Sequence, residues 1–334
     1  MAKKKVLVTG GAGFIGSHIV HSHLENGDEV WVVDNLQTGR IENIEDCLRN
    51  PRFRFDRDDL RIWPYLDEAV SWATHIYHMI ADVGQKYVLT HPIDTLSNNI
   101  ESLERMLLAM CETKSNAYLL FSSTSEIYGH SHIKNDGTID EQAIVSFASG
   151  EFLQQTYPLS KLVNETMLLS YKHEKNIKCV IARLFNTVGL NQTATYGMVF
   201  PNFIEEALIG RPITVYGDGT QSRSFCNVHD TVRALSMIID HPDCNGQIVN
   251  VGCDRETSIL DLAHMIKNIT GSNSPIEFIP YKKAYGCDFV DIMRRRPNLA
   301  KIKQLTGYEP HWNLEDTIRE VAEVMKQKIY AHHH

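Results

Sequence analysis

Short apolar runs alternate with amphipathic stretches along most of the chain. Seven runs rich in β-branched and aromatic residues predict strands, at 6–9, 29–34, 52–56, 74–80, 117–123, 179–185 and 248–252. Apolar residues three or four positions apart predict helices between them, at 14–25, 63–72, 99–113 and 157–174. Strands without a polar face are typical of a parallel sheet that helices cover on both sides. We therefore expect an α/β fold with a doubly wound parallel sheet.

Beyond residue 186 this alternation gives way to segments that contain glycine and proline, which indicates a smaller lobe. We expect residues 1–185, with a returning segment at about 225–252, to form the sheet domain. Residues 186–224 and 253–330 would form a C-terminal substrate-binding lobe that ends in a helix from Leu314 to about Ile329. Residues 331–334 are typical of the remnant of an expression tag.

Composition excludes several classes of partner. With 43% hydrophobic and 22% charged residues, the 334-residue chain is typical of a soluble protein. A net charge of -8 gives no basic field for nucleic acid or an anionic membrane. Apolar runs all fall short of the roughly 20 residues that span a bilayer, and the N-terminus has no signal-peptide pattern. We expect a cytoplasmic protein.

The seven cysteines are scattered and include no C-x-x-C pair. They have no histidine partners at the spacings of metal ligands. We expect reduced thiols and no metal site.

Three glycines mark a dinucleotide site after the first strand. Gly10 permits a tight turn, Gly13 lets backbone N–H groups approach a pyrophosphate, and Gly16 allows the following helix to pack closely on the strand. A strand before this motif and a helix after it make the motif specific. The sequence therefore predicts a Rossmann-type domain.

Acidic residues at the next strand ends favour NAD over NADP. Asp34 ends the second strand eighteen residues after Gly16, near the spacing at which a carboxylate binds the adenosine ribose, and it would repel a 2′-phosphate. Arg40 is near enough in sequence to leave NADP open. Asp59, after the third strand, is a candidate for the adenine amino group, with a solvated strand end as the equal alternative.

Tyr157 and Lys161 stand four residues apart, so both project from one face of a helix. Because Pro158 is tolerated in a first helical turn, we expect the helix to begin at about Thr156. The helix dipole and Lys161 would then lower the pKa of the phenol toward that of a general base. The expected cofactor-binding residues are Gly10, Gly13, Phe14, Ile15, Gly16, Asp34, Asn35, Asp59, Leu60, Asn99, Tyr157 and Lys161.

The fifth strand ends in Thr124, Ser125 and Glu126, at the sheet edge where open α/β folds bind ligands. Turn formation or helix capping is the alternative role of the hydroxyls. A Glu at a buried sheet end is costly unless a substrate or partner uses it. The expected catalytic residues are Thr124, Ser125, Glu126, Tyr157 and Lys161.

Together, the three glycines, Asp34, Thr124 and the Tyr157–Lys161 pair resemble the extended short-chain dehydrogenase/reductase family of nucleotide-sugar epimerases, decarboxylases and dehydratases. The resemblance covers residues 5 to about 328. It implies that Tyr157 takes the proton of the sugar C4 hydroxyl, that Thr124 binds the same oxygen, and that C4 hydride passes to tightly held NAD. Lys161 would bind the nicotinamide ribose.

Later segments resemble the same family. The stretch 183–186 resembles R-x-F-N, whose Asn, here Asn186, contacts a nucleotide diphosphate. The stretch 217–225 resembles one that carries a diphosphate-binding arginine, here Arg223. Arg295, within 281–297, best matches the active-site arginine of UDP-glucuronate decarboxylases. The resemblance also implies a homodimer through the helices of Asn99 and Tyr157.

The fate of the 4-keto sugar stays open among several reactions. Thr124-Ser125-Glu126 departs from the Thr-Asp-Glu of dTDP-glucose dehydratases and from simple UDP-glucose epimerases, and occurs in UDP-glucuronate decarboxylases and GDP-mannose dehydratases. Residues 154–156 lack the arginine common in decarboxylases, and Ile80 replaces a small residue beside the cofactor.

We expect a C4 epimerase of a UDP-hexose or UDP-hexuronic acid, an isomerase rather than a lyase. UDP-glucuronate decarboxylase, nucleotide-sugar 4,6-dehydratase and a non-catalytic NAD sensor are the alternatives.

Overall fold

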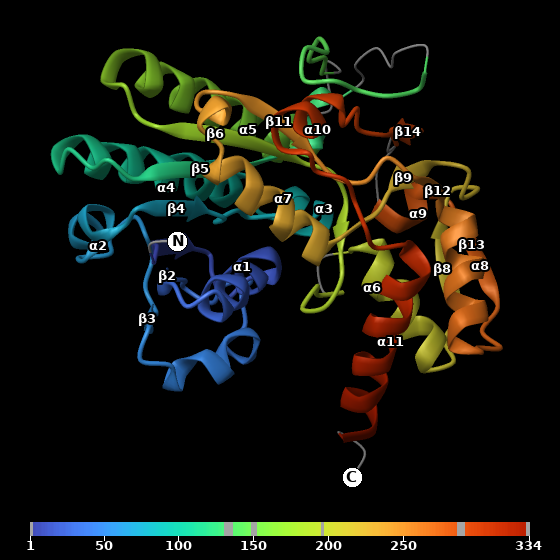
Figure 1. The fold of residues 1–334 in the computed structure, drawn as a ribbon. Coiled ribbons are helices and arrows are strands. Elements are labelled where there is room, and N and C mark those ends of the chain that lie inside the picture. The colour runs from blue at the N-terminus through green and yellow to red at the C-terminus, as the bar shows by residue number, and fades with distance from the viewer. Residues whose placement is uncertain (1–2, 130–135, 148–151, 195–196, 286–290, 332–334) are drawn as a thin grey trace.

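A seven-stranded parallel sheet forms the centre of the protein, in a computed structural model that describes residues 3–129, 136–147, 152–194, 197–285 and 291–331 (Figure 1). The strand order is β11-β6-β5-β4-β1-β2-β3, with every neighbouring pair parallel. The strands are β1 (Lys5–Thr9), β2 (Glu29–Val33), β3 (Phe53–Asp56), β4 (His75–His78), β5 (Tyr118–Thr124), β6 (Cys179–Leu184) and β11 (Ile248–Val251). All seven predicted strands are confirmed, and with them the doubly wound α/β fold.

Alternate residues of each strand enter different hydrophobic cores. In β1, Val6 and Val8 face the core beneath one set of helices, and Leu7 faces the core on the other side. Both faces are buried, which explains why the strands read as continuous apolar runs. The first set is α1 (Phe14–Glu25), α7 (Val228–Asp240) and α10 (Ala300–Thr306); the second is α2 (Leu66–Trp72), α4 (Pro92–Glu112) and α5 (Phe152–Lys175).

A third core lies in a smaller lobe, where apolar faces of three helices pack together. Figure 1 shows these helices opposite α2 and α4. The lobe contains α6 (Val199–Leu208), α8 (Ile259–Thr270), α9 (Tyr281–Tyr285), α11 (Leu314–Ala331) and the strand pairs β8 (Ile213–Tyr216) with β13 (Ile276–Ile279), and β9 (Ser222–Ser224) with β12 (Glu256–Ser258) and β14 (Arg294–Arg295). Shorter elements are β7 (Thr187–Val188), β10 (Cys226–Asn227), α3 (Gln85–Thr90) and the 3-10 turns Ile41–Asn43, Glu45–Arg49, Ser125–Tyr128 and Pro242–Cys244.

The proposed domain division remains a prediction, and one part of the predicted lobe packs elsewhere. Ile302 of α10 and the following Tyr308 are fully buried in the core of the sheet face that α1 and α7 cover. The segment 300–308 therefore returns to the sheet after the chain has left the lobe.

Helix α5 begins at Phe152 rather than at about Thr156, so that prediction was wrong. Pro158 lies inside the helix, where it removes one backbone hydrogen bond. Packing of α5 against α4 and the sheet evidently outweighs this local preference. Tyr157 consequently stands in the second turn, where the helix dipole acts on it less strongly than the sequence suggested.

A buried ion pair joins α5 to the sheet. The Arg183 guanidinium of β6 donates from Nε and Nη2 to the two Glu165 oxygens, at 3.0 and 2.7 Å, and the Ser123 hydroxyl of β5 donates to the same carboxylate at 2.5 Å. Both charged side chains are at most 5% exposed. This network fixes α5 beside the end of β5.

We expect Glu165→Gln to lower the free energy of unfolding by about 3 kcal/mol, because it leaves the Arg183 charge buried without its counter-ion. Urea unfolding measures the change. Glu68→Gln, in the exposed Arg54–Glu68 pair at 3.5 Å, is the control and should change it by less than about 0.5 kcal/mol. Equal effects of the two substitutions would contradict the prediction.

Candidate active site

A cavity of about 620 Å³ lies along the carboxyl ends of the central strands and extends to the lobe. It is lined by all the predicted site residues except Asn99, namely Gly10, Gly13, Phe14, Ile15, Gly16, Asp34, Asn35, Asp59, Leu60, Thr124, Ser125, Glu126, Tyr157, Lys161, Asn186, Arg223 and Arg295. Parallel strands end at one edge of the sheet, which is why residues far apart in sequence meet there.

The glycine turn after β1 leaves no room for side chains. A Cβ on Gly16 would lie 2.1 Å from the Gly10 carbonyl oxygen, and a Cβ on Gly10, whose φ is +73°, would lie 3.0 Å from the Ile80 nitrogen. The glycines therefore let the turn pack closely against its own backbone and the chain after β4. The start of α1 lines the cavity, where the N–H groups of its first turn are available to an anion.

Asp34 is held rigidly at the end of β2. Its two carboxylate oxygens accept the N–H groups of Ala12 and Leu36 at 2.9 and 2.8 Å. Burial raises the pKa of Asp34, and these two hydrogen bonds oppose the rise. Each oxygen keeps a lone pair for a ligand hydroxyl.

Asp59 forms an ion pair with Arg61, two residues further along the chain. The Arg61 guanidinium donates to its carboxylate at 2.6 Å, and this bond lowers the pKa of Asp59. The Asp59 carboxylate is therefore charged. It binds Arg61, and Asp59 also lines the cavity.

Asn99 lies behind the cavity wall. Its side-chain oxygen accepts the Asp82 N–H at 2.9 Å, and its amide donates to the Ser160 hydroxyl of α5 at 3.0 Å. Asp82 lines the cavity and was not predicted, although it follows β4 by only four residues at the ligand-binding edge. Burial raises the pKa of Asp82, whose carboxylate accepts the Asn98 amide at 2.6 Å.

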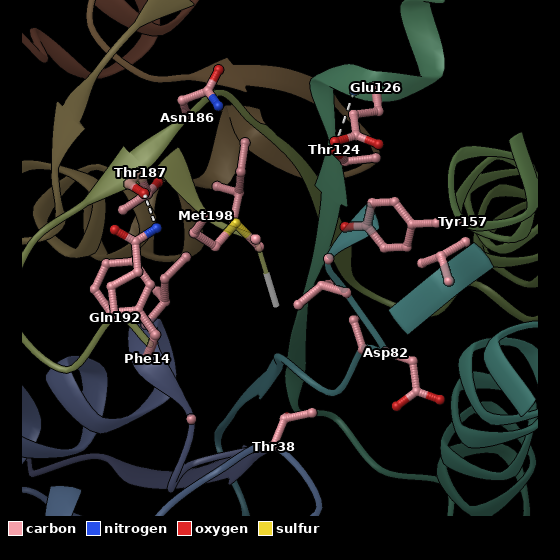
Figure 2. A pocket seen from close by; sticks show the side chains of 18 of the residues that line it. Phe14, Thr38, Asp82, Thr124, Glu126, Tyr157, Asn186, Thr187, Gln192 and Met198 are labelled. Atoms are coloured by element: carbon pink, nitrogen blue, oxygen red, sulfur yellow. Dashed lines mark hydrogen bonds between the residues drawn. The ribbon is translucent and has the colours of Figure 1, made fainter. Parts of the chain in front are cut away.

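Thr124, Glu126 and Tyr157 gather on one side of the cavity (Figure 2). Burial and the Glu126 charge raise the pKa of Tyr157, whereas a hydrogen bond with Thr124 opposes the rise. The expected lowering of this pKa is thus absent in the chain alone, because Tyr157 is buried beside an acid. The Lys161 ammonium donates to the Ser122 carbonyl at 2.7 Å and lies over the Phe121 ring.

Two arginines line the side of the cavity formed by the lobe. The Arg295 guanidinium lies 3.8 Å from the Glu126 carboxylate. Burial lowers the pKa of Arg295, and Glu126 raises it. Arg223 donates to Asp291 at 2.6 Å, and Asp291 also accepts the Tyr281 hydroxyl at 2.9 Å. The Arg223 guanidinium would therefore bind a phosphate and Asp291 at the same time.

Two amides at the cavity, Asn186 and Gln192, have side-chain oxygens that are buried without a hydrogen-bond partner among the described residues. Nine buried side-chain atoms of the described residues have no such partner, and these two are the ones whose residues line the cavity, where a ligand can reach them. Asn186 was predicted from its R-x-F-N stretch. Gln192 was not, because it lies in a loop whose position no strand pattern determines.

One potential group of metal ligands forms away from this cavity. His21 Nδ1 lies 3.5 Å from the Cys47 sulfur, and Asp46 completes the group. Burial raises the pKa of Cys47 to about 12, which opposes ligation by thiolate. Sequence spacing did not show this cluster.

Two predicted features involve residues outside the described ranges. Gly286 in the stretch 281–297, and Cys287, lie there, as do residues 332–334 of the predicted tag. The six described cysteines are free thiols. In the described part of the chain, the helices are too short or too polar to cross a membrane.

Residues 6–252 match the model of the NAD dependent epimerase/dehydratase family. The chain is 33% identical to UDP-glucuronic acid decarboxylase 1 of Danio rerio over 98% of its own length and 74% of the relative. It is 31% identical to the UDP-N-acetyl-alpha-D-glucosaminuronate decarboxylase of Bacillus cytotoxicus over 97% of this chain and 98% of that one.

Among solved structures, the UDP-glucuronic acid 4-epimerase of Bacillus cereus, in complex with UDP-glucuronic acid and NAD, is similar. It has a TM-score of 0.86 and 26% identity, and the match covers 97% of this chain and 99% of that one. The curated relatives are decarboxylases, so the expectation of an isomerase rather than a lyase is not supported.

The buried Lys161 generates a pH prediction for the cofactor-free protein. Burial lowers the pKa of Lys161 from 10.5 to about 7. Between these values the unfolded chain binds more protons, so folded-state stability rises with pH; below about pH 7 the penalty is fully present. We expect the melting temperature of the wild type to rise relative to that of Lys161→Met as pH increases from 7 to 9. Parallel profiles of the two proteins would refute this pKa assignment.

Proposed function

We propose that this chain, which belongs to the NAD dependent epimerase/dehydratase family, removes carbon dioxide from a UDP-hexuronic acid after transient oxidation at the sugar C4. The observation that carries the proposal is the Glu126–Arg295 pair, which meets at the cavity beside Tyr157. The decarboxylases among the relatives support it.

The cavity fits NAD, the cofactor of the family. Gly10, Gly13 and Gly16 line the cavity, and the N–H groups at the start of α1 would hold the pyrophosphate there. Asp34 would use its remaining lone pairs for the adenosine ribose hydroxyls, and Asp59 would contact the adenine amino group. When bound, NAD supplies a reversible hydride acceptor and a positively charged ring.

The sugar C4 hydroxyl loses its proton to Tyr157, and Thr124 donates or accepts a hydrogen bond at the same oxygen. Burial keeps Tyr157 protonated in the chain alone, so it becomes a base only when positive charge is placed beside it. Lys161, fixed to the Ser122 carbonyl, directs its remaining protons toward the cavity.

Decarboxylation follows from the chemistry of the 4-keto sugar. The C5 carboxylate is then a β-keto acid. The C5–C6 bond breaks, carbon dioxide leaves, and the electron pair of the bond forms an enolate with C4. C5 then takes a proton from water, and C4 is reduced again. Arg295 binds the entering carboxylate. The negative Glu126, 3.8 Å from Arg295, repels that carboxylate, and departure of carbon dioxide relieves the repulsion.

The nucleotide diphosphate would lie toward the lobe. The Asn186 amide and the Arg223 guanidinium line this part of the cavity and carry the N–H donors that phosphate oxygens require.

A C4 epimerase of a UDP-hexuronic acid is the second candidate. This epimerase would also oxidise C4. The 4-keto sugar would then rotate in the site and keep its carboxylate. The similarity over 97% of the chain to the epimerase of Bacillus cereus favours it.

We also propose a cytoplasmic homodimer. The six described cysteines are free, as in a reducing compartment. Apolar side chains are exposed on α4 and α5, the helices that pack on one another at the surface: Ile93, Leu96, Leu108, Leu153 and Val163.

Incubation with UDP-glucuronate, UDP-N-acetylglucosaminuronate and UDP-glucose tests the reaction. We expect mass spectrometry to show loss of one carbon dioxide from an acid sugar and no change of mass in UDP-glucose. Unchanged mass with an inverted C4 in the NMR spectrum would establish the epimerase, loss of water a dehydratase, and no altered sugar a sensor. Tyr157→Phe, the control, should retain NAD and lose turnover.

We expect Glu126→Gln to slow carbon dioxide release by about 100-fold, in line with the loss of one preorganised electrostatic group, while C4 oxidation continues and NADH absorbance accumulates. Glu256→Gln is the matched control, because it removes the carboxylate partner of the adjacent Arg294 without lining the cavity. Wild-type release by Glu126→Gln would exclude the proposed role.

A further inference from the structure

The segment 189–193, here termed the strap, lies across helix α1. It follows β7, and its Leu190 carbonyl accepts the His18 Nε2–H at 3.0 Å, while its Asn191 amide donates to the Ser17 hydroxyl at 3.1 Å. Both partners lie in the first turns of α1, directly after the glycine turn. The strap is therefore attached to the element that receives the cofactor pyrophosphate.

A third contact ties the strap to the loop after β2. The exposed Arg40 guanidinium donates to the Thr193 hydroxyl at 3.1 Å. Arg40 therefore binds the strap. This contact gives a structural reason for an arginine close to Asp34 in the sequence. The strap backbone is also unusual, since Gly189 has φ +149° and Asn191 has φ +67°. Asparagine tolerates this left-handed conformation better than other non-glycine residues, so Asn191 suits the turn that the strap makes here.

Between these anchors, Gln192 faces the cavity. Its side-chain N–H donates to the Thr187 carbonyl at 3.2 Å, which fixes the orientation of the amide. Its side-chain oxygen is buried and has no partner among the described residues. Figure 2 shows Gln192 on the same side of the cavity as Phe14 and Thr187, across from Tyr157. The structure thus holds a buried acceptor in place for a ligand.

The chemistry of that acceptor restricts its partner. Phosphate oxygens at neutral pH are acceptors themselves, so the Gln192 oxygen cannot bind the pyrophosphate. A dinucleotide carries donors on its ribose hydroxyls and on its nicotinamide amide. A ligand without such a donor would leave the buried oxygen unpaired, at a cost in binding.

We infer that Gln192 is a cofactor-binding residue and that the strap retains NAD in its site. Gln192 accepts a hydrogen bond from a ribose hydroxyl or the nicotinamide amide, and the three anchors keep the strap closed over the bound dinucleotide. The inference rests on NAD as the cofactor and is independent of the fate of the sugar.

Dissociation of NAD from the loaded protein tests the acceptor role. Protein loaded with NAD is mixed with excess etheno-NAD, and the fluorescence change reports NAD release. We expect Gln192→Met, which keeps the side-chain volume, to release NAD about 10-fold faster with an unchanged association rate. Gln327→Met on the exposed face of α11 is the control and should match the wild type. Equal release from Gln192→Met and the wild type would overturn the inference.

A second variant tests the strap without touching Gln192. Asn191→Gly with Thr193→Val keeps the backbone conformation and removes two anchors. We expect both association and dissociation of NAD to accelerate several-fold while the Kd changes little. Unchanged rates would refute retention by the strap. UDP binding, measured by calorimetry, should be the same in all variants; a loss of UDP affinity with normal NAD release in Gln192→Met would assign the residue to the substrate and overturn the proposal.

Discussion

The close approach of α1 to β1 is the constraint on which the site depends. Gly16 packs against the Gly10 carbonyl so tightly that any Cβ would lie 2.1 Å from the oxygen. This contact sets where α1 begins and directs its free N–H groups at the sheet edge. Asp34, the strap and the loop after β4 are then placed around that helix end, each by hydrogen bonds to a neighbour of the turn. A larger residue at Gly16 would displace the helix and with it every cofactor contact.

The sheet was predictable because local pattern and tertiary environment agree. Each central strand is buried on both faces, so its apolar run is visible without knowledge of its neighbours. Helix starts were less predictable. Helix α5 continues through Pro158 because contacts with α4 and the sheet compensate for a lost backbone bond. Helix α4 begins at Pro92, seven residues before the apolar periodicity becomes clear, since proline suits a first turn and the first buried positions of the helix are the polar Thr95 and Asn99.

The site was predictable where its residues end strands or form part of a recognised motif, and unpredictable where folding brings side chains together. Thr124, Tyr157 and Asp34 belong to the first class. The pairing of Arg223 with Asp291, and of Arg295 with Glu126, depends on how β14 lies beside β9, which no local pattern specifies. The predicted lowering of the Tyr157 pKa was wrong for the same reason. Burial and the neighbouring Glu126 carboxylate arise only in the tertiary structure, and both raise this pKa more than the helix dipole lowers it.

The charges that line the cavity connect cofactor retention with the proposed reaction. Asp82 and Asp34 are negative groups that burial makes costly, and Lys161 and Arg295 are positive groups under the same penalty. A reaction that oxidises C4 and then reduces it again has no net redox change, so exchange of NAD between turnovers would bring no benefit. A cofactor that stays bound supplies permanent counter-charge to these groups. The strap would then contribute to the reaction by retaining NAD, because a site that balances its charges only when loaded is stabilised by keeping its cofactor.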